Sequence, residues 1–250
     1  MSLDPHLNRL RAHSFGSIAE QYDRFRPPLP DAAIDDLLAL GPSEVLDVGC
    51  GTGKVAAALR APGVHVLGIE ADERMAALAR SHGVPVEVAK FENWADRGRQ
   101  FDLATSADAW HWLDPERGIA KAADVLWPGG TLALFWSFQT FDDDLNDALA
   151  AMYRKYAPDC TTHSYEPYQA QTEPFPAVPE FEPIRTRTYR WDEQITAADW
   201  TGLLGTFSDH LALRPERRIR VLEKVAGVLD DFGGTVTAHR GTYAVYATRR

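Results

Sequence analysis

The chain alternates short apolar runs with longer stretches in which apolar residues recur every three or four positions. The stretches between the runs have the spacing of amphipathic helices. Strands that alternate with helices in this way predict an α/β domain with a parallel sheet. The runs that we interpret as buried strands are residues 45–48, 64–70, 84–90, 101–105 and 131–137. The N-caps that we expect for the helices are Asp31, Asp72, Asp114 and Thr196.

The pattern changes after residue 138, where the regular alternation ends. The elements then expected are a helix at 142–157, a proline-rich loop at 158–180, a strand at 181–191, helices from Thr196 and at 215–232, and a strand at 242–248. We expect one domain over residues 1–250, in which residues 138–215 form a cap on the ligand side of the sheet. A structural element for dimerisation is the alternative for residues 138–180.

The most informative local motif is VLDVGCGTGK at residues 45–54, where a strand runs into a turn with glycine at every second position. A phosphate-binding P-loop needs G-x-x-x-x-G-K-[S/T], which Val48 and Val55 exclude. A dinucleotide fingerprint, G-x-G-x-x-G, needs glycine where Lys54 stands. The remaining frame is D-x-G-x-G-x-G, from Asp47 to Gly53. It predicts that a polar small molecule binds at the carboxyl end of this strand.

A second signature follows at residues 101–137, with the segments HWLDP and LWPGGTL. Together with the glycine turn and Glu70, it resembles the motifs of class I S-adenosyl-L-methionine (SAM)-dependent methyltransferases that act on small molecules, such as the methylases of trans-aconitate. The resemblance covers about residues 10–137. It implies SAM as cofactor, S-adenosyl-L-homocysteine (SAH) as product and a small-molecule substrate. It also implies a Rossmann-like, doubly wound, mainly parallel seven-stranded sheet in the order 3-2-1-4-5-7-6, with the last strand antiparallel and a mostly helical cap.

The N-terminal residues 1–30 contain F-x-x-x-A-x-x-Y-x-x-x-R-P, which begins at Phe15. Helical spacing alone predicts an amphipathic helix packed on the core. The resemblance implies a lid over the SAM site, in which Tyr22 closes over the cofactor and Arg26 pairs with its carboxylate.

Glu70 ends the second strand, where a carboxylate can accept two hydrogen bonds from ribose hydroxyls. Its alternative is a cap of the next helix, for which Asp72 is better placed. Phe91 would stack on the adenine or belong to the core. Lys90 stands where the family has an acidic residue facing the adenine, so Glu92 is its substitute. The full set expected to bind the cofactor is Tyr22, Arg26, Asp47, Gly49, Cys50, Gly51, Gly53, Glu70, Ala71, Phe91, Glu92, Ser106 and Ala107.

His111 is the candidate catalytic residue. It follows the fourth strand and would act as general base for a hydroxyl or amine acceptor, whereas an anionic acceptor needs no base. Its alternative is a histidine that orders the loop. We expect O-methylation rather than N- or C-methylation, and the alternative for the whole protein is a SAM-type fold that binds or regulates without transferring methyl groups. The candidate substrate contacts are Trp110, Trp112, Trp136, His163, Tyr165 and Ser208.

Composition narrows the partners. The 250 residues carry a net charge of −10, which argues against a nucleic-acid partner. Cys50 and Cys160 give neither a disulfide framework nor a metal-binding spacing, so we expect no metal site. No stretch approaches the roughly 18 apolar residues of a membrane span, and the N-terminus lacks a signal-peptide core. We therefore expect a cytoplasmic protein with no membrane partner, and a homodimer is left open.

Overall fold

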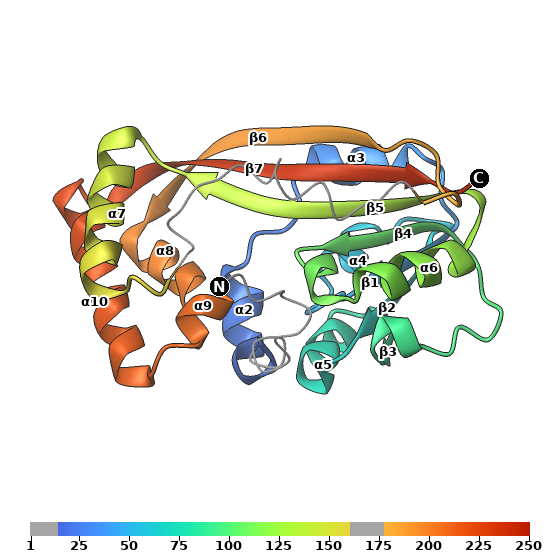
Figure 1. Ribbon diagram of the computed structural model, residues 1–250, viewed down its shortest axis with the longest axis horizontal. Helices are drawn as coiled ribbons and strands as arrows, with labels where there is room; N and C mark the ends of the chain where they lie inside the picture. Colours follow the sequence, from blue (N-terminus) through green and yellow to red (C-terminus); the bar gives the residue numbers. More distant parts are fainter. Residues whose placement is uncertain (1–14, 161–177) are drawn as a thin grey trace.

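The computed structural model describes residues 15–160 and 178–250. Its centre is a seven-stranded sheet in the order β3-β2-β1-β4-β5-β7-β6 (Figure 1). Strands β1 to β5 pair in parallel, whereas β7 is antiparallel to both β5 and β6. The predicted order and the antiparallel last strand are therefore confirmed. The strands are β1 (Glu44–Val48), β2 (His65–Glu70), β3 (Val86–Val88), β4 (Phe101–Ala107), β5 (Leu126–Thr140), β6 (Arg185–Thr196) and β7 (Thr235–Thr248).

Helices cover both faces of this sheet, and three predicted N-caps are confirmed. Asp72 accepts from Arg74 N, Asp114 accepts from Arg117 N, and Thr196 accepts from Asp199 N. The α-helices are α2 (Ala19–Phe25), α3 (Asp31–Leu38), α4 (Lys54–Ala58), α5 (Glu73–Ser81), α6 (Pro115–Val125), α7 (Asp143–Tyr156), α8 (Ala197–Leu204), α9 (Ser208–Leu211) and α10 (Pro215–Asp231), and the 3₁₀ turns are η2 (Phe15–Ile18), η3 (Phe91–Asn93) and η4 (Trp110–Trp112).

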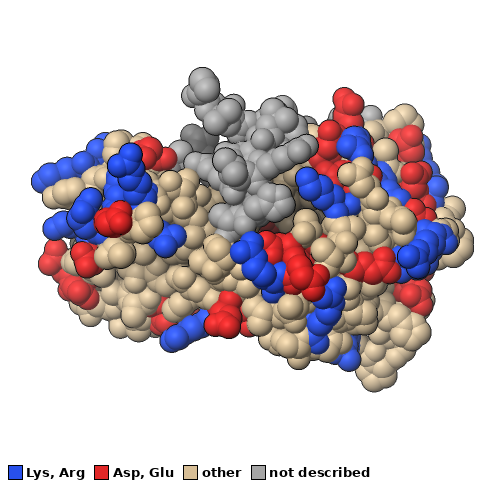
Figure 2. Space-filling model, turned by 90° about the horizontal axis from the view of Figure 1, so that it is seen from below, with Lys and Arg blue, Asp and Glu red and all other residues tan. Residues whose placement is uncertain are grey.

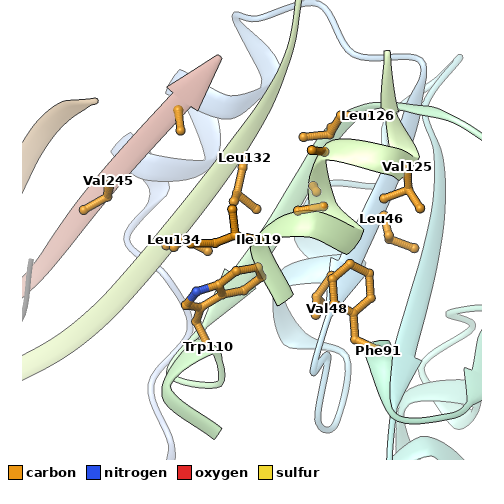
Figure 3. Close-up of a cluster of buried hydrophobic side chains, with 14 of the residues drawn as sticks. Leu46, Val48, Phe91, Trp110, Ile119, Val125, Leu126, Leu132, Leu134 and Val245 are labelled. Atoms are coloured by element: carbon orange, nitrogen blue, oxygen red, sulfur yellow. The ribbon is translucent and has the colours of Figure 1, made fainter. Parts of the chain in front are cut away.

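Two buried clusters lie on opposite faces of the parallel strands. One contains Phe91, Trp110 and Ile119 and fills the space between the sheet and α6 (Figure 3). The other joins α3 and α4 to the opposite face of the sheet. Strands buried on both faces explain the continuous apolar runs of the sequence.

Strands β5, β6 and β7 extend well beyond the other four and carry α7, α8 and α10 at their far end (Figure 1). The helices there have their own buried cluster, which includes Leu149, Trp200 and Val225. The predicted strand bounds of 131–137 and 242–248 were too short, because polar residues in the extension, such as His239 and Arg240, interrupt the apolar pattern. These residues nevertheless pair in register with neighbouring strands.

Residues 15–25, which form η2 and α2, lie between the cap helices and α5 (Figure 1). Gln21 of α2 donates to the carbonyl of Gly202 in α8, 3.4 Å away. At the other end, Gly16 lies against the carboxylate of Asp72 at the start of α5. The predicted cap by Asp31 is wrong, since α3 begins at that residue after Pro30, which has no side-chain oxygen to accept a hydrogen bond.

Acidic and basic side chains are interspersed on the face shown in Figure 2. Over residues 15–160 and 178–250, every helix is too short or too polar to span a bilayer.

Candidate functional site

A cavity lies at the carboxyl ends of β1 and β4, where the glycine turn begins. The space that it encloses is about 550 Å³ when the part open to solvent is included. Seven residues expected to bind the cofactor meet there: Tyr22, Arg26, Asp47, Gly49, Cys50, Gly51 and Ala107. The wall also contains residues that were not expected to bind the cofactor: Pro27, Pro28, Leu29, Thr52, Lys54, Val55, Asp108 and Ser137.

The glycine turn needs its glycines for two different reasons. Gly49 and Gly53 have φ of 66° and 83°, and a Cβ at either position would lie 2.6 Å from Ala109 Cβ or 2.8 Å from Ala79 Cβ. These two positions therefore admit only glycine. A Cβ on Gly51, with φ of 56°, would be in ordinary contact with Met75 Cε at 3.5 Å. At this position only the backbone conformation favours glycine.

Asp47 is a buried residue whose carboxylate links β1 to the elements on either side of the glycine turn. Its carboxylate accepts hydrogen bonds from Thr105 Oγ1 at 2.8 Å and from Ala56 N at 3.2 Å. Burial raises the pKa of Asp47 to about 6, against the lowering effect of both hydrogen bonds. These bonds tie β1 to β4 and α4, so Asp47 shapes the cavity from its floor.

Glu70 lies directly beside the turn. Its Oε2 accepts from Gly51 N at 3.0 Å and its Oε1 from Asp72 N at 2.8 Å. Burial raises the pKa of this carboxyl, although the backbone hydrogen bonds oppose the shift. Each oxygen keeps a second lone pair. Asp72 caps α5, so the alternative role of Glu70 as that cap is not needed; Ala71 lies between them.

The predicted lid contacts both the turn and the cap. A Cβ on Gly51 would lie 4.0 Å from the ring of Tyr22, whose pKa is raised by burial. Arg26 donates through Nε to Thr206 Oγ1 at 2.9 Å, and its guanidinium lies 4.3 Å from the ring centre of Phe207. Lys54 Nζ donates to the carbonyl of Arg26 at 2.8 Å. Arg26 is therefore positioned at the cavity by contacts from both sides.

His111 follows β4 in the turn η4 but is not part of the cavity wall. Its ring lies 4.9 Å from that of Trp112, which packs edge-on against Phe15 at 5.9 Å. Burial lowers the pKa of His111 to about 4, although the negative charge of Asp108 raises it. The imidazole is therefore neutral at pH 7 and able to accept a proton.

Asp108 has a backbone conformation that favours glycine, with φ of 50°. Its N–H donates to the carbonyl of Phe135 at 2.9 Å, and its Oδ1 accepts from Ser137 N at the same distance. These two bonds hold the loop against β5 and place the carboxylate in the cavity wall. The sequence signal for this residue was its place in the loop that follows the fourth strand.

Three aromatic residues expected at the site belong to the core instead. Phe91 and Trp110 point into the cluster under α6 (Figure 3), with ring centres 6.3 Å apart. Trp136 is buried in the same cluster and packs on Tyr243. It lies on the opposite face of β5 from Ser137, because successive residues of a strand alternate in direction. Their placement supports packing rather than contact with cofactor or substrate.

The remaining expected residues have varied surroundings. Glu92 accepts from Asp114 N at 3.0 Å and so orders the start of α6. Ser106 is fully buried, and its hydroxyl has no hydrogen-bond partner within residues 15–160 and 178–250. Ser208 begins α9, two residues after Thr206. His163 and Tyr165 lie outside the described residues.

The cap contains a buried polar cluster that sequence spacing did not indicate. Tyr153 and His210 are joined at 2.9 Å, and His210 Nδ1 lies 2.8 Å from Asp209 Oδ1. The Sγ of Cys160, a carboxylate oxygen of Asp209 and a ring nitrogen of His210 all lie within 4.8 Å of one another. These side chains join α7 to α9, and the histidine finds a partner at each ring nitrogen.

Comparison with known proteins supplies relatives for the fold and for the first half of the chain. Residues 46–134 match the protein family described as a methyltransferase domain. An uncharacterized methyltransferase of Mycobacterium tuberculosis is 39% identical over 127 residues, which are 50% of this chain and 52% of that protein. Trans-aconitate 2-methyltransferase of Deinococcus radiodurans is 35% identical over 122 residues, 46% of this chain and 47% of that protein.

The chain thus spans about half the length of the curated relatives that it matches. Likeness in three dimensions extends further. A solved structure described as a type II methyltransferase from Anaeromyxobacter dehalogenans superposes with a TM-score of 0.66 at 27% identity, covering 90% of this chain and 98% of that one.

Proposed function

We propose that this chain, whose residues 46–134 match a methyltransferase domain, is a class I SAM-dependent methyltransferase that transfers the methyl group of SAM to a small-molecule acceptor. The observation that carries the proposal is the cavity beside Gly51, which is bordered by backbone, two cations and the carboxylate of Asp108. We propose that the N-terminal segment from Phe15 and the cap at residues 138–215 enclose the acceptor above it.

The residues around the cavity fit the cofactor because they offer further hydrogen-bond acceptors and positive charge. Glu70, the last residue of β2, keeps one lone pair on each oxygen and would hold the ribose. Arg26 and Lys54 place positive charge in the cavity wall and would hold the carboxylate of the methionine part. SAM, when bound, supplies an activated methyl group, so the protein's part is to bind, orient and exclude water.

His111 is the proposed proton acceptor for a hydroxyl acceptor. Its pKa of about 4 keeps it unprotonated at neutral pH. It is therefore available as a base, although a weaker one than an ordinary histidine. A carboxylate acceptor would need no base, and His111 would then order the loop beside Trp112.

Calorimetric titration with SAM and with SAH tests the proposal first. Binding of both, followed by transfer of labelled methyl groups to one of a panel of acids, phenols and amines, would support it. Failure of the purified protein to bind either molecule would refute it. Binding without transfer to any acceptor would favour the alternative, a SAM-type fold that binds or regulates.

His111→Ala tests the catalytic role separately from binding. If His111 is the base, turnover should fall by about 10²- to 10⁴-fold with unchanged SAH affinity. Retained turnover would limit His111 to ordering the loop. Trp112→Phe, which keeps a ring against Phe15, is the control for loop packing.

A further inference from the structure

Two buried hydrogen-bond donors lie where the long strands meet the cap. Arg240 of β7 is 6% exposed, and its Nε and Nη1 have no hydrogen-bond partner in the part of the chain that the structure describes. The indole Nε1 of Trp200 in α8 is buried and without a partner in the same way. Both side chains are donors only. Since buried polar groups are nearly always satisfied, the pair indicates an acceptor that comes from outside these residues.

Glu193 does not supply this acceptor. Its Oε2 lies 2.6 Å from Arg240 Nε, so the two form an ion pair. This contact is an ion pair and not a hydrogen bond, and among the described residues Nη1 has no hydrogen-bond partner. The Glu193 side chain is also 49% exposed, so water weakens its pull on the guanidinium.

The register of the strands places Arg240 close to the proposed cofactor cavity. Ser137, in the cavity wall, pairs with Thr242, and Gln139 pairs with Arg240. Paired residues and residues two apart in a strand point to the same face. Arg240 is therefore on the face that borders the cavity, one step of two residues, or about 7 Å, toward the cap.

Trp200 approaches the same place from the cap. Its ring packs edge-on against Phe141 at 4.9 Å, and Phe141 follows Gln139 by two residues. Ala238, the next residue after Arg240 on this face in the direction of the cap, belongs to the same buried cluster as Trp200. The two side chains, each with a donor that lacks a hydrogen-bond partner among the described residues, thus flank one region between the strands and α8.

We propose that Arg240 and Trp200 form a subsite for a carboxylate group of the methyl acceptor. This inference rests on the proposed function, because it assigns the chemical class of the molecule that the cavity would methylate. A carboxylate offers only acceptors and matches two donor-only side chains. Bound at Arg240, a short organic acid extends back toward Ser137 and the cofactor cavity.

The test is calorimetric titration of the SAH-saturated protein with succinate, glutarate and benzoate, each paired with its uncharged amide. At least one acid should bind in the millimolar range or tighter, and its amide should not. Arg240→Met should weaken that acid by about tenfold or more while SAH affinity stays within about twofold. Trp200→Phe keeps the ring on Phe141 and should weaken the acid by a smaller factor.

The matched control is Arg190→Met. Arg190 lies in β6 on the opposite face of the sheet, where its guanidinium stacks on Phe138 at 5.2 Å, so the acid should bind this variant as it binds the wild type. Arg240→Lys, which keeps the charge but not the planar fork, should give an intermediate affinity and serves if the methionine variant does not fold. Binding of SAH with no acid bound, or equal binding of the acid by Arg240→Met, would overturn the inference and leave the proposed function standing. Failure to bind SAH would instead refute the proposed function.

Discussion

Glu70→Gln separates the structural role of the β2 carboxylate from its proposed role in cofactor binding. The wild-type oxygens accept from Gly51 N and Asp72 N at 3.0 and 2.8 Å. In the variant, an NH₂ group replaces one oxygen and faces a backbone N–H, so one of these two bonds is lost. Loss of one partially buried acceptor should reduce the free energy of unfolding by about 1–3 kcal/mol.

The same substitution should also weaken the binding of SAM. If both oxygens also accept from ribose hydroxyls, replacing one of them costs roughly a further 1–3 kcal/mol of binding, which is about a 5- to 150-fold loss of affinity. Urea unfolding with and without SAH measures both quantities in one experiment, because a bound ligand adds stability according to its affinity. Glu73→Gln, which alters an exposed carboxylate at the start of α5, should change neither.

The pH dependence adds a second check. Burial raises the pKa of Glu70, so wild-type affinity for SAM should fall as the pH drops toward that raised value, where the carboxylate takes up its proton. The glutamine variant cannot titrate at this position and should lose this component. Equal SAM affinity in wild type and variant, at any loss of stability, would show that Glu70 only supports the turn.

Three further predictions concern stability. The pKa of Asp47 is raised to about 6, so its contribution to stability is complete below its unfolded pKa of about 4 and is lost as the pH rises through 6. Urea unfolding of wild type and Asp47→Asn should show a difference that changes by up to about 3 kcal/mol between pH 4 and 7, and a constant difference would contradict the shift. Tyr153→Phe removes the hydrogen bond to the fully buried His210 and should cost about 1–3 kcal/mol in the same assay; a neutral result would mean that the histidine finds another partner. Gly202→Ala should lower Tm, because the new Cβ would lie 2.4 Å from the ring of Phe25. The cost of this overpacking, about 1–3 kcal/mol, should exceed the gain in helix propensity, about 1 kcal/mol. A raised Tm would show that α2 can shift relative to α8 to make room for the methyl group.

Local patterns in the sequence were sufficient for the alternation of strands and helices. Apolar runs predicted the parallel strands, and Asp72, Asp114 and Thr196 marked helix starts correctly. These features depend on neighbours within a few residues, so the chain shows them before it folds. The glycine frame from Asp47 to Gly53 also identified one wall of the cavity, because each glycine answers a backbone requirement of the turn itself.

The sequence was less informative about which side of an element a residue would face. Phe91, Trp110 and Trp136 were expected at the site, yet each is buried in the core. A tryptophan serves equally well in a core and in a pocket wall. Only the folded sheet decides that the face of β5 with Trp136 packs in the α6 cluster and the face with Ser137 borders the cavity. The lengths of β5 and β7 were also missed, since their far ends are paired polar segments that resemble loops.

What the sequence by itself determined is therefore the nature of the turn, the order of the elements and the resemblance that followed from them. Tertiary structure alone decided how distant segments meet: Arg26 against Thr206, Asp108 against Ser137, and Arg240 one strand step from the cavity. The physical reason is that each contact joins residues far apart in the chain. Whether a charged side chain has a hydrogen-bond or ion-pair partner depends on neighbours that only the folded sheet and its cap provide.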